Sequence, residues 1–340
     1  MSKKIPARII RQVFILLVLI GAAVMITYQM LPYLGGILAA ITLFVILVPA
    51  QRYLENRKWK PWLAATLLLI ASIIGILLPL AGLALLFTSR IKDAAKNSEQ
   101  ITEQIKSQLS QIESFVGFEI IPAIDAEQIK STFSYLISNI ASSGLTIFIA
   151  VGIMFFILYY MLIERETWQK ASLIYLPLKK ENIETIGKES IELVKSNALA
   201  IPLVAILQGV VALIGYFIFG VENPFFWFGV TVIGSMIPFV GTALGIAPVV
   251  ILLLAQGDTT AAIGILIYGA VVVGATDNLF RLIVQKKLAN IHPMITLIGV
   301  VVGVPLFGFI GLIFGPLLVS LFLLLIKIYK NEYGSQSDAI

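Results

Sequence analysis

The stretch Pro305-Leu-Phe-Gly-Phe-Ile-Gly-Leu-Ile-Phe-Gly-Pro316 and the similar stretch Pro238-Phe-Val-Gly-Thr-Ala-Leu-Gly-Ile-Ala-Pro248 both lie inside long apolar sequence. Proline lacks a backbone N–H and clashes with the preceding helical turn, and glycine has a low helix propensity. We therefore expect Pro238 with Gly241, and Pro305 with Gly308, each to interrupt an apolar helix.

The composition around these two breaks is that of a membrane protein. Of the 340 residues 59% are hydrophobic and 13% are charged, with a mean hydropathy of +0.98. One globular core cannot bury so much apolar sequence, so we expect an all-α, polytopic integral membrane protein. The net charge of +5 is interpreted as a topology signal and not as affinity for nucleic acid.

The residues that usually carry chemistry are scarce. The chain has no cysteine and a single histidine, His292. This excludes a disulfide framework, a thiolate nucleophile and a metal site built from several histidines. We expect no catalytic residues, no metal and no cofactor.

A spanning helix needs about 20 apolar residues. This length predicts six full spans and two broken blocks that fold as re-entrant helical hairpins. The spans are residues 12–30, 33–50, 61–88, 144–163, 197–219 and 260–276, and the broken blocks are residues 225–256 and 294–326.

Positive charges set the expected orientation, because loops on the cytoplasmic side are enriched in lysine and arginine. Such residues precede the first span and follow the second, so these two spans should form a hairpin with both ends inside. If each broken block crossed once, Arg281, Lys286 and Lys287 would lie outside. If the two blocks instead form re-entrant hairpins that enter from opposite sides of the membrane, these three cations lie on the cytoplasmic side. We expect both termini on the cytoplasmic side of the cell's inner membrane.

The chain divides into five predicted regions. A polar segment follows the third span, with Ile101, Ile105, Leu109 and Ile112 on one helical face; it predicts a gate over a pore or a hairpin that packs against other subunits. The residues before about 195 predict surface helices on the cytoplasmic face. The regions are spans one to three (1–88), an extracytoplasmic insert (89–142), span four with surface helices (143–196), a transport core (197–330) and a cytoplasmic tail (331–340).

A set of residues in the second half resembles the autoinducer-2 exporter family of bacterial membrane proteins, which also includes sodium(lithium)/proton antiporters. Leu282 departs from the family, which commonly has proline directly after the arginine. The resemblance implies a transporter without an ATP-binding domain that forms a homo-oligomer. The set is Gln208-Gly209, Ile237 to Gly241, Pro248, Asp277-Asn278 with Arg281, His292-Pro293, Gly308, Gly311, Gly315 and Pro316.

Two kinds of candidate site follow. Backbone groups freed at Pro238, Gly241, Pro305 and Gly308, together with Gln208, form the expected pathway for a small polar solute or a monovalent cation. The alternative is that the glycines only allow close helix packing. Asp277, Asn278 and Arg281 are candidates for coupling to an ion gradient, because charged groups are costly in a membrane. The alternative for Asp277 and Arg281 is a structural ion pair.

The broken hairpins predict a secondary transporter, and the resemblance implies export of a small polar signal or metabolite such as autoinducer-2. A monovalent cation/proton antiporter is the alternative, and a scaffold or channel component stays possible. An intramembrane hydrolase is disfavoured because Ser235 has no Gly-x-Ser-x-Gly setting. The chain lacks a P-loop sequence, so it contains no ATP-driven motor of that type.

Overall fold

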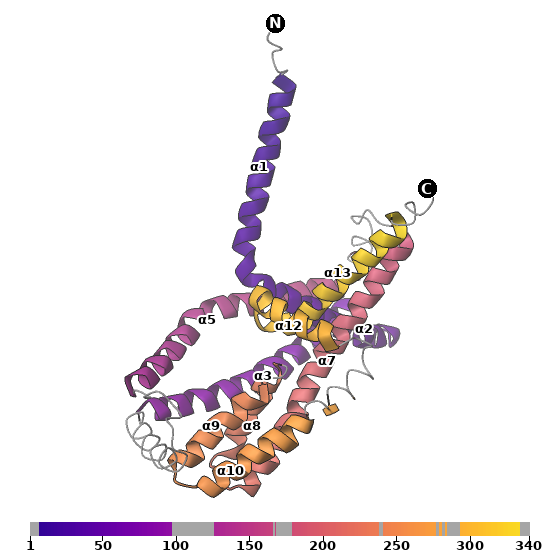
Figure 1. The fold of residues 1–340 in the computed structure, drawn as a ribbon. Helices are drawn as coiled ribbons and strands as arrows, with labels where there is room; N and C mark the ends of the chain where they lie inside the picture. The colour runs from indigo at the N-terminus through magenta and orange to yellow at the C-terminus, as the bar shows by residue number, and fades with distance from the viewer. Residues whose placement is uncertain are drawn as a thin grey trace, which may run out of the picture.

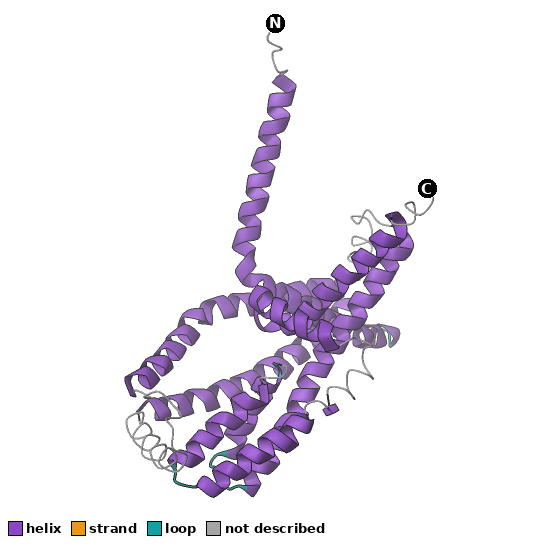
Figure 2. Cartoon of the chain, viewed as in Figure 1, coloured by secondary structure: helices purple, strands orange, loops and turns teal. Residues whose placement is uncertain are grey.

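The structure is a computed structural model that describes residues 7–96, 126–165, 167, 179–237, 241–276, 279–280, 283 and 293–333. Every secondary-structure element in these residues is helical (Figure 2). The elements are α1 (Ala7–Met30), η1 (Leu31–Tyr33), α2 (Leu34–Asn56), α3 (Pro61–Lys96), α5 (Ala126–Ile163), α7 (Lys180–Ile218), α8 (Pro224–Ser235), α9 (Gly241–Ala255), α10 (Thr259–Tyr268), η2 (Gly269–Val273), α12 (Pro293–Phe307), η3 (Gly308–Ile310) and α13 (Gly311–Tyr333).

Six stretches of the described chain are long and apolar enough to cross a membrane. The predicted all-α, multi-pass architecture is therefore confirmed. Four stretches each overlap one predicted span, the first covers two predicted spans, and the last covers the second broken block. They are Arg8–Asn56, Pro61–Pro79, Gly144–Ile163, Lys180–Ile218, Thr259–Thr276 and Met294–Lys330.

Helices α2, α3 and α5 pack together into one bundle. Ala40, Ala65 and Leu158, one from each helix, are fully buried in the bundle core. A Cβ added at Gly36 of α2 would collide with the backbone of Ala150 in α5, so these two helices are in backbone contact. Small residues permit such close approach between helices in membranes.

Helix α7 is the longest described element, with 39 residues, and one helix of each broken block, α8 and α13, packs along it (Figure 1). It runs without interruption from Lys180 to Ile218. The prediction of separate surface helices before a span that starts at Asn197 is therefore wrong for residues 180–196. No proline or glycine stands at the expected boundary, so nothing ends the helix there.

Helix α1 departs from the predicted hairpin with α2. Every residue from Arg8 to Met30 is exposed, and α1 extends away from the other helices (Figure 1). In lipid an apolar helix gains no hydrophobic stabilisation by packing on another helix. The short turn η1 can therefore join the two helices without bringing them side by side.

Helices α3 and α5 are longer than a membrane requires. Their 36 and 38 residues correspond to about 54 and 57 Å, whereas the hydrocarbon core is about 30 Å thick. Both continue beyond their predicted spans toward the polar segment between them. The predicted face of Ile101, Ile105, Leu109 and Ile112 lies outside the described residues.

Candidate functional site

The first broken block folds back on itself as a pair of antiparallel helices, α8 and α9. A Cβ at Gly241 would collide with the backbone of Gly234, and a Cβ at Gly245 would collide with Thr231. The two helices therefore touch through backbone near the turn. Gly241 starts α9, while Pro238 lies outside the described residues.

The second broken block forms a similar pair, α12 and α13. A Cβ at Gly299 would collide with Pro316, and one at Gly303 would meet the backbone of Gly311 and Gly315. The break lies at Gly308, whose φ of 62° is a left-handed conformation that glycine adopts readily. Pro305 does not end the helix, because α12 continues through it to Phe307.

The first hairpin, α8 with α9, lies on the C-terminal half of α7. Gly209 leaves room for Val232 and Phe228 of α8, and the Tyr216 hydroxyl lies 2.7 Å from Thr231 Oγ1. Thr231 Oγ1 donates its own hydrogen to the Trp227 carbonyl at 2.8 Å, so Tyr216 donates to Thr231. Since α8 runs antiparallel to α7, the turn of this hairpin points toward the middle of α7.

The second hairpin, α12 with α13, meets α7 from the other end. Leu193 and Val194 of α7 are buried together with Phe314 and Leu317 of α13. Asn197 Nδ2 donates to the Ile313 carbonyl at 3.4 Å. Helix α13 also runs antiparallel to α7, and the turn at Gly308 lies against α2, where an added Cβ at Gly35 would be 3.5 Å from the Phe307 carbonyl oxygen. The two hairpins thus contact α7 from opposite ends, one at Leu193 to Asn197 and the other at Gly209 to Tyr216 (Figure 1).

A third segment reaches this part of α7. The side chain of Phe280 packs on the buried Ala200 and Val204, between the positions that the two hairpins contact. Phe280 lies close in sequence to the candidate coupling residues. Asp277, Asn278 and Arg281 are themselves outside the described residues, as is His292.

Several polar side chains of α7 and α8 are buried. Asn197 and Gln208 of α7 are 5% and 0% exposed, and Ser235 at the end of α8 is 2% exposed. Asn197 and Gln208 are eleven residues apart, which places them on one helical face about 16 Å apart along the axis. We call the stretch of α7 from residue 197 to 208 the central segment.

The central segment also contains a proline that sequence reasoning did not single out. Pro202 lies inside α7, and Pro316 lies inside α13. A proline cannot donate to the carbonyl four residues before it, which here belongs to Ala198 and to Leu312. The repeated Pro-x-x-Gly pattern drew attention to the hairpins, whereas a lone proline within an apolar run gave no comparable signal.

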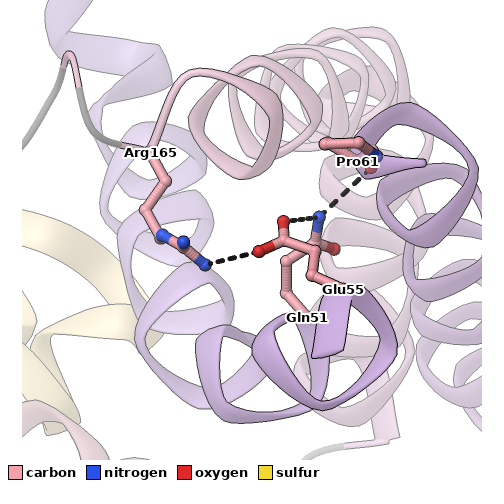
Figure 3. Close-up of polar contacts among 4 residues, drawn as sticks. All are labelled: Gln51, Glu55, Pro61 and Arg165. Atoms are coloured by element: carbon pink, nitrogen blue, oxygen red, sulfur yellow. Dashed lines mark hydrogen bonds and ion pairs between the residues drawn. The ribbon is translucent and has the colours of Figure 1, made fainter. Parts of the chain in front are cut away.

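A second polar cluster joins the ends of α2, α3 and α5 (Figure 3). Arg165 Nη1 lies 3.2 Å from Glu55 Oε2, and the fully buried Gln51 donates from Nε2 to Glu55 Oε1 at 2.9 Å and to the Pro61 carbonyl at 3.1 Å. The sequence did not point to this cluster, because its ion pair joins residues that are 110 positions apart.

Comparison with known proteins places this architecture among transporters. The model of the AI-2E family transporter matches residues 13–331. Three relatives carry the name "Putative transport protein". That of Aquifex aeolicus is 22% identical over 86% of this chain and 89% of its own. That of Helicobacter pylori is 26% identical over 54% of each chain. That of Methanocaldococcus jannaschii is 23% identical over 89% of this chain and 92% of its own.

Proposed function

The chain belongs to the AI-2E transporter family, and from this membership we propose that it is a secondary transporter that exports a small polar signal or metabolite such as autoinducer-2. One observation supports the proposal: two helical hairpins of opposite direction contact α7 on the two sides of its buried polar central segment. Irregular backbone at membrane depth is tolerated where it is buried in protein or lines a cavity. We propose the cytoplasmic membrane of the cell as the location.

The hairpins supply parts that can move as units. Backbone contacts at Gly234 with Gly241, and at Gly303 with Gly311, hold the two helices of each hairpin together. We propose that one hairpin moves relative to α7 while the other stays closed. The central segment is then open to one side of the membrane at a time, as in transporters built from opposed repeats.

The chemistry of the central segment favours a neutral polar solute. Its buried polar groups include the amides of Asn197 and Gln208, and the hydroxyl of Ser235 is buried at the end of α8. Amides and hydroxyls both donate and accept hydrogen bonds, as a polyhydroxylated solute requires. In the described part of α7 after residue 195, and in α8, α9 and α12, there is no charged residue.

We propose that Asp277 couples transport to an ion gradient. The support is its position three residues before Phe280, whose side chain contacts the central segment at Ala200 and Val204. Replacement Asp277→Asn is then expected to remove the dependence of flux on the gradient while the protein still folds. Misfolding of both Asp277→Asn and Arg281→Gln would support a structural ion pair instead.

Flux in proteoliposomes tests the proposal. Purified protein is reconstituted, and the movement of labelled autoinducer-2 is followed with and without a pH gradient; sodium and lithium are added separately while the gradient is monitored. We expect saturable, gradient-dependent movement of the labelled solute. Dissipation of the gradient by sodium or lithium without movement of the label would favour the cation/proton antiporter.

A pair of variants connects the flux to the central segment. Gln208→Leu removes the buried amide at nearly constant volume, and Ile206→Leu changes a neighbouring side chain that is 48% exposed. We expect flux to be lost in the first variant and kept in the second. Equal flux in both would show that the solute does not use Gln208.

We also propose that the protein is a homo-oligomer, with α1 at the contact between copies. The support is the apolar surface of α1, which is exposed from Arg8 to Met30. Deletion of residues 1–33 should convert the detergent-solubilised oligomer into a monomer, as measured by light scattering. An unchanged number of subunits in the detergent-solubilised protein would refute a role of α1.

A further inference from the structure

The turn between α2 and α3, residues 51–62, concentrates positive charge and aromatic rings at one end of the bundle. Its four cationic side chains are all exposed, and so are its three aromatic side chains. The turn joins the ends of two apolar helices, so it lies at the level of the lipid headgroups. The cations are Arg52, Arg57, Lys58 and Lys60, and the aromatic residues are Tyr53, Trp59 and Trp62.

The charge of these cations is not compensated within the described structure. Glu55 is the only carboxylate of the turn, and its two oxygens are engaged by Arg165 and Gln51 (Figure 3). Among the described residues, none of the four cations forms an ion pair. Within the described residues, Arg165 at the end of α5 neutralises Glu55, and no carboxylate pairs with the cations of the turn.

The backbone of the turn is fixed. Lys58 N–H donates to the Glu55 carbonyl at 2.8 Å and Trp59 N–H donates to the Leu54 carbonyl at 3.2 Å, the two bonds of a Schellman motif. Gln51 joins the end of α2 to the Pro61 carbonyl at the start of α3. The Arg57 guanidinium lies 4.7 Å from the centre of the Tyr53 ring. The cations are thus presented from a rigid support.

The conformation of Lys58 is a second, independent observation. Its φ is 64°, the left-handed conformation for which glycine is the usual residue at this position of a Schellman motif. A side chain kept in such a conformation points to a function for that side chain. Here the side chain adds a cation at the tip of the turn.

We propose that the α2–α3 turn binds the phosphate-bearing headgroup of an anionic phospholipid of the surrounding membrane. Cationic clusters directly next to spanning helices bind anionic lipids, and tryptophan favours the headgroup level of a bilayer. Each cation contributes about fivefold to the affinity for an anionic surface. The proposal is independent of the transported solute and of the side of the membrane on which the turn lies.

Tryptophan quenching by brominated lipid provides the test. The chain has four tryptophans, so Trp168→Phe and Trp227→Phe leave only Trp59 and Trp62, both in the turn. The full-length protein is reconstituted in bilayers with brominated phosphatidylglycerol or brominated phosphatidylcholine. We expect quenching to select phosphatidylglycerol by about tenfold or more. Equal quenching by the two lipids would overturn the proposal.

Charge variants separate a specific site from general attraction. Arg57→Gln with Lys58→Gln should lower the selectivity by up to roughly 25-fold, since each of the two cations contributes about fivefold. Lys188→Gln with Lys195→Gln removes the same charge from exposed positions of α7 and should leave the selectivity unchanged. An equal loss in both double variants would show a general effect of net charge and would contradict a site at the turn.

Lys58→Gly distinguishes binding from a structural role. Glycine relieves the left-handed backbone, so thermal stability in detergent should be unchanged or higher, whereas the selectivity should fall about fivefold. Unchanged selectivity would refute a role of the Lys58 side chain in binding. Millimolar inorganic phosphate should not displace phosphatidylglycerol; displacement would assign the turn to a soluble phosphate and overturn the lipid proposal.

Discussion

Replacement Gly303→Ala tests the close packing of the second hairpin. A Cβ at residue 303 would lie 2.5 Å from the Gly311 carbonyl oxygen and 2.5 Å from Gly315 Cα. Ordinary contacts of a Cβ are at 3.4–4 Å, so α12 and α13 must separate by about 1 Å. Both obstacles are backbone atoms, and no change of side-chain rotamer can relieve the collision.

The magnitude follows from two opposing effects. Alanine stabilises a helix interior by about 0.5–1 kcal/mol relative to glycine. Overpacking of a tight contact costs about 1–3 kcal/mol. Gly152→Ala is the matched control, because Gly152 lies in α5 with nothing within 4 Å of an added Cβ and experiences only the first effect. The two variants should therefore differ in stability by about 1–3 kcal/mol, with Gly303→Ala the less stable.

Thermal unfolding of the purified proteins in one detergent measures this difference. At about 2 °C per kcal/mol for a chain of this size, Gly303→Ala should unfold roughly 2–6 °C below Gly152→Ala. Flux through Gly303→Ala should also fall, because a separated hairpin no longer moves as a unit. Identical unfolding temperatures would refute backbone contact between α12 and α13.

Three further replacements test individual contacts. Thr231→Val leaves the buried Tyr216 hydroxyl without its partner and should lower the free energy of unfolding by about 1–3 kcal/mol. Addition of Tyr216→Phe should recover most of this loss, and no recovery would contradict the hydrogen bond. A double-mutant cycle of Glu55→Gln and Arg165→Gln should give a coupling of up to about 1 kcal/mol in thermal unfolding, and additive effects would show that the pair contributes nothing. Asn197→Leu removes the bond to α13 and should lower flux severalfold without loss of folded protein; wild-type flux would exclude Asn197 from the pathway.

Hydropathy and helix-breaking residues predicted much of the fold. The fourth predicted span, residues 144–163, lies within the longer helix α5, and both broken blocks fold back as helical hairpins. These features are local, because an apolar run of sufficient length or a glycine at a turn acts on its own neighbours. Local sequence also placed the second break near Pro305, although the left-handed residue is Gly308.

Contacts between distant segments were not predictable in the same way. Nothing in the sequence near Glu55 indicates that Arg165 is its partner, since four cations lie much closer in the chain. The contact of Phe280 with Ala200 and Val204 is likewise between apolar side chains without a distinctive pattern. Of the candidate site, Gln208 and the two hairpins came from the sequence, whereas Asn197 and Pro202 required the structure. The coupling of transport to an ion gradient through Asp277 and Arg281 stays a prediction.

The absence of natural cysteines allows a direct test of the central claim that solute passes the central segment of α7. Ala205→Cys places a thiol on the buried face beside Gln208, and Ile206→Cys places one on the exposed face, since these residues are 0% and 48% exposed. Each variant is treated with a water-soluble maleimide during solute flux in proteoliposomes. We expect Ala205→Cys to be modified only while the protein transports, with loss of flux on modification, and Ile206→Cys in the lipid to stay unmodified. Continued flux with Ala205→Cys never modified would contradict the central claim.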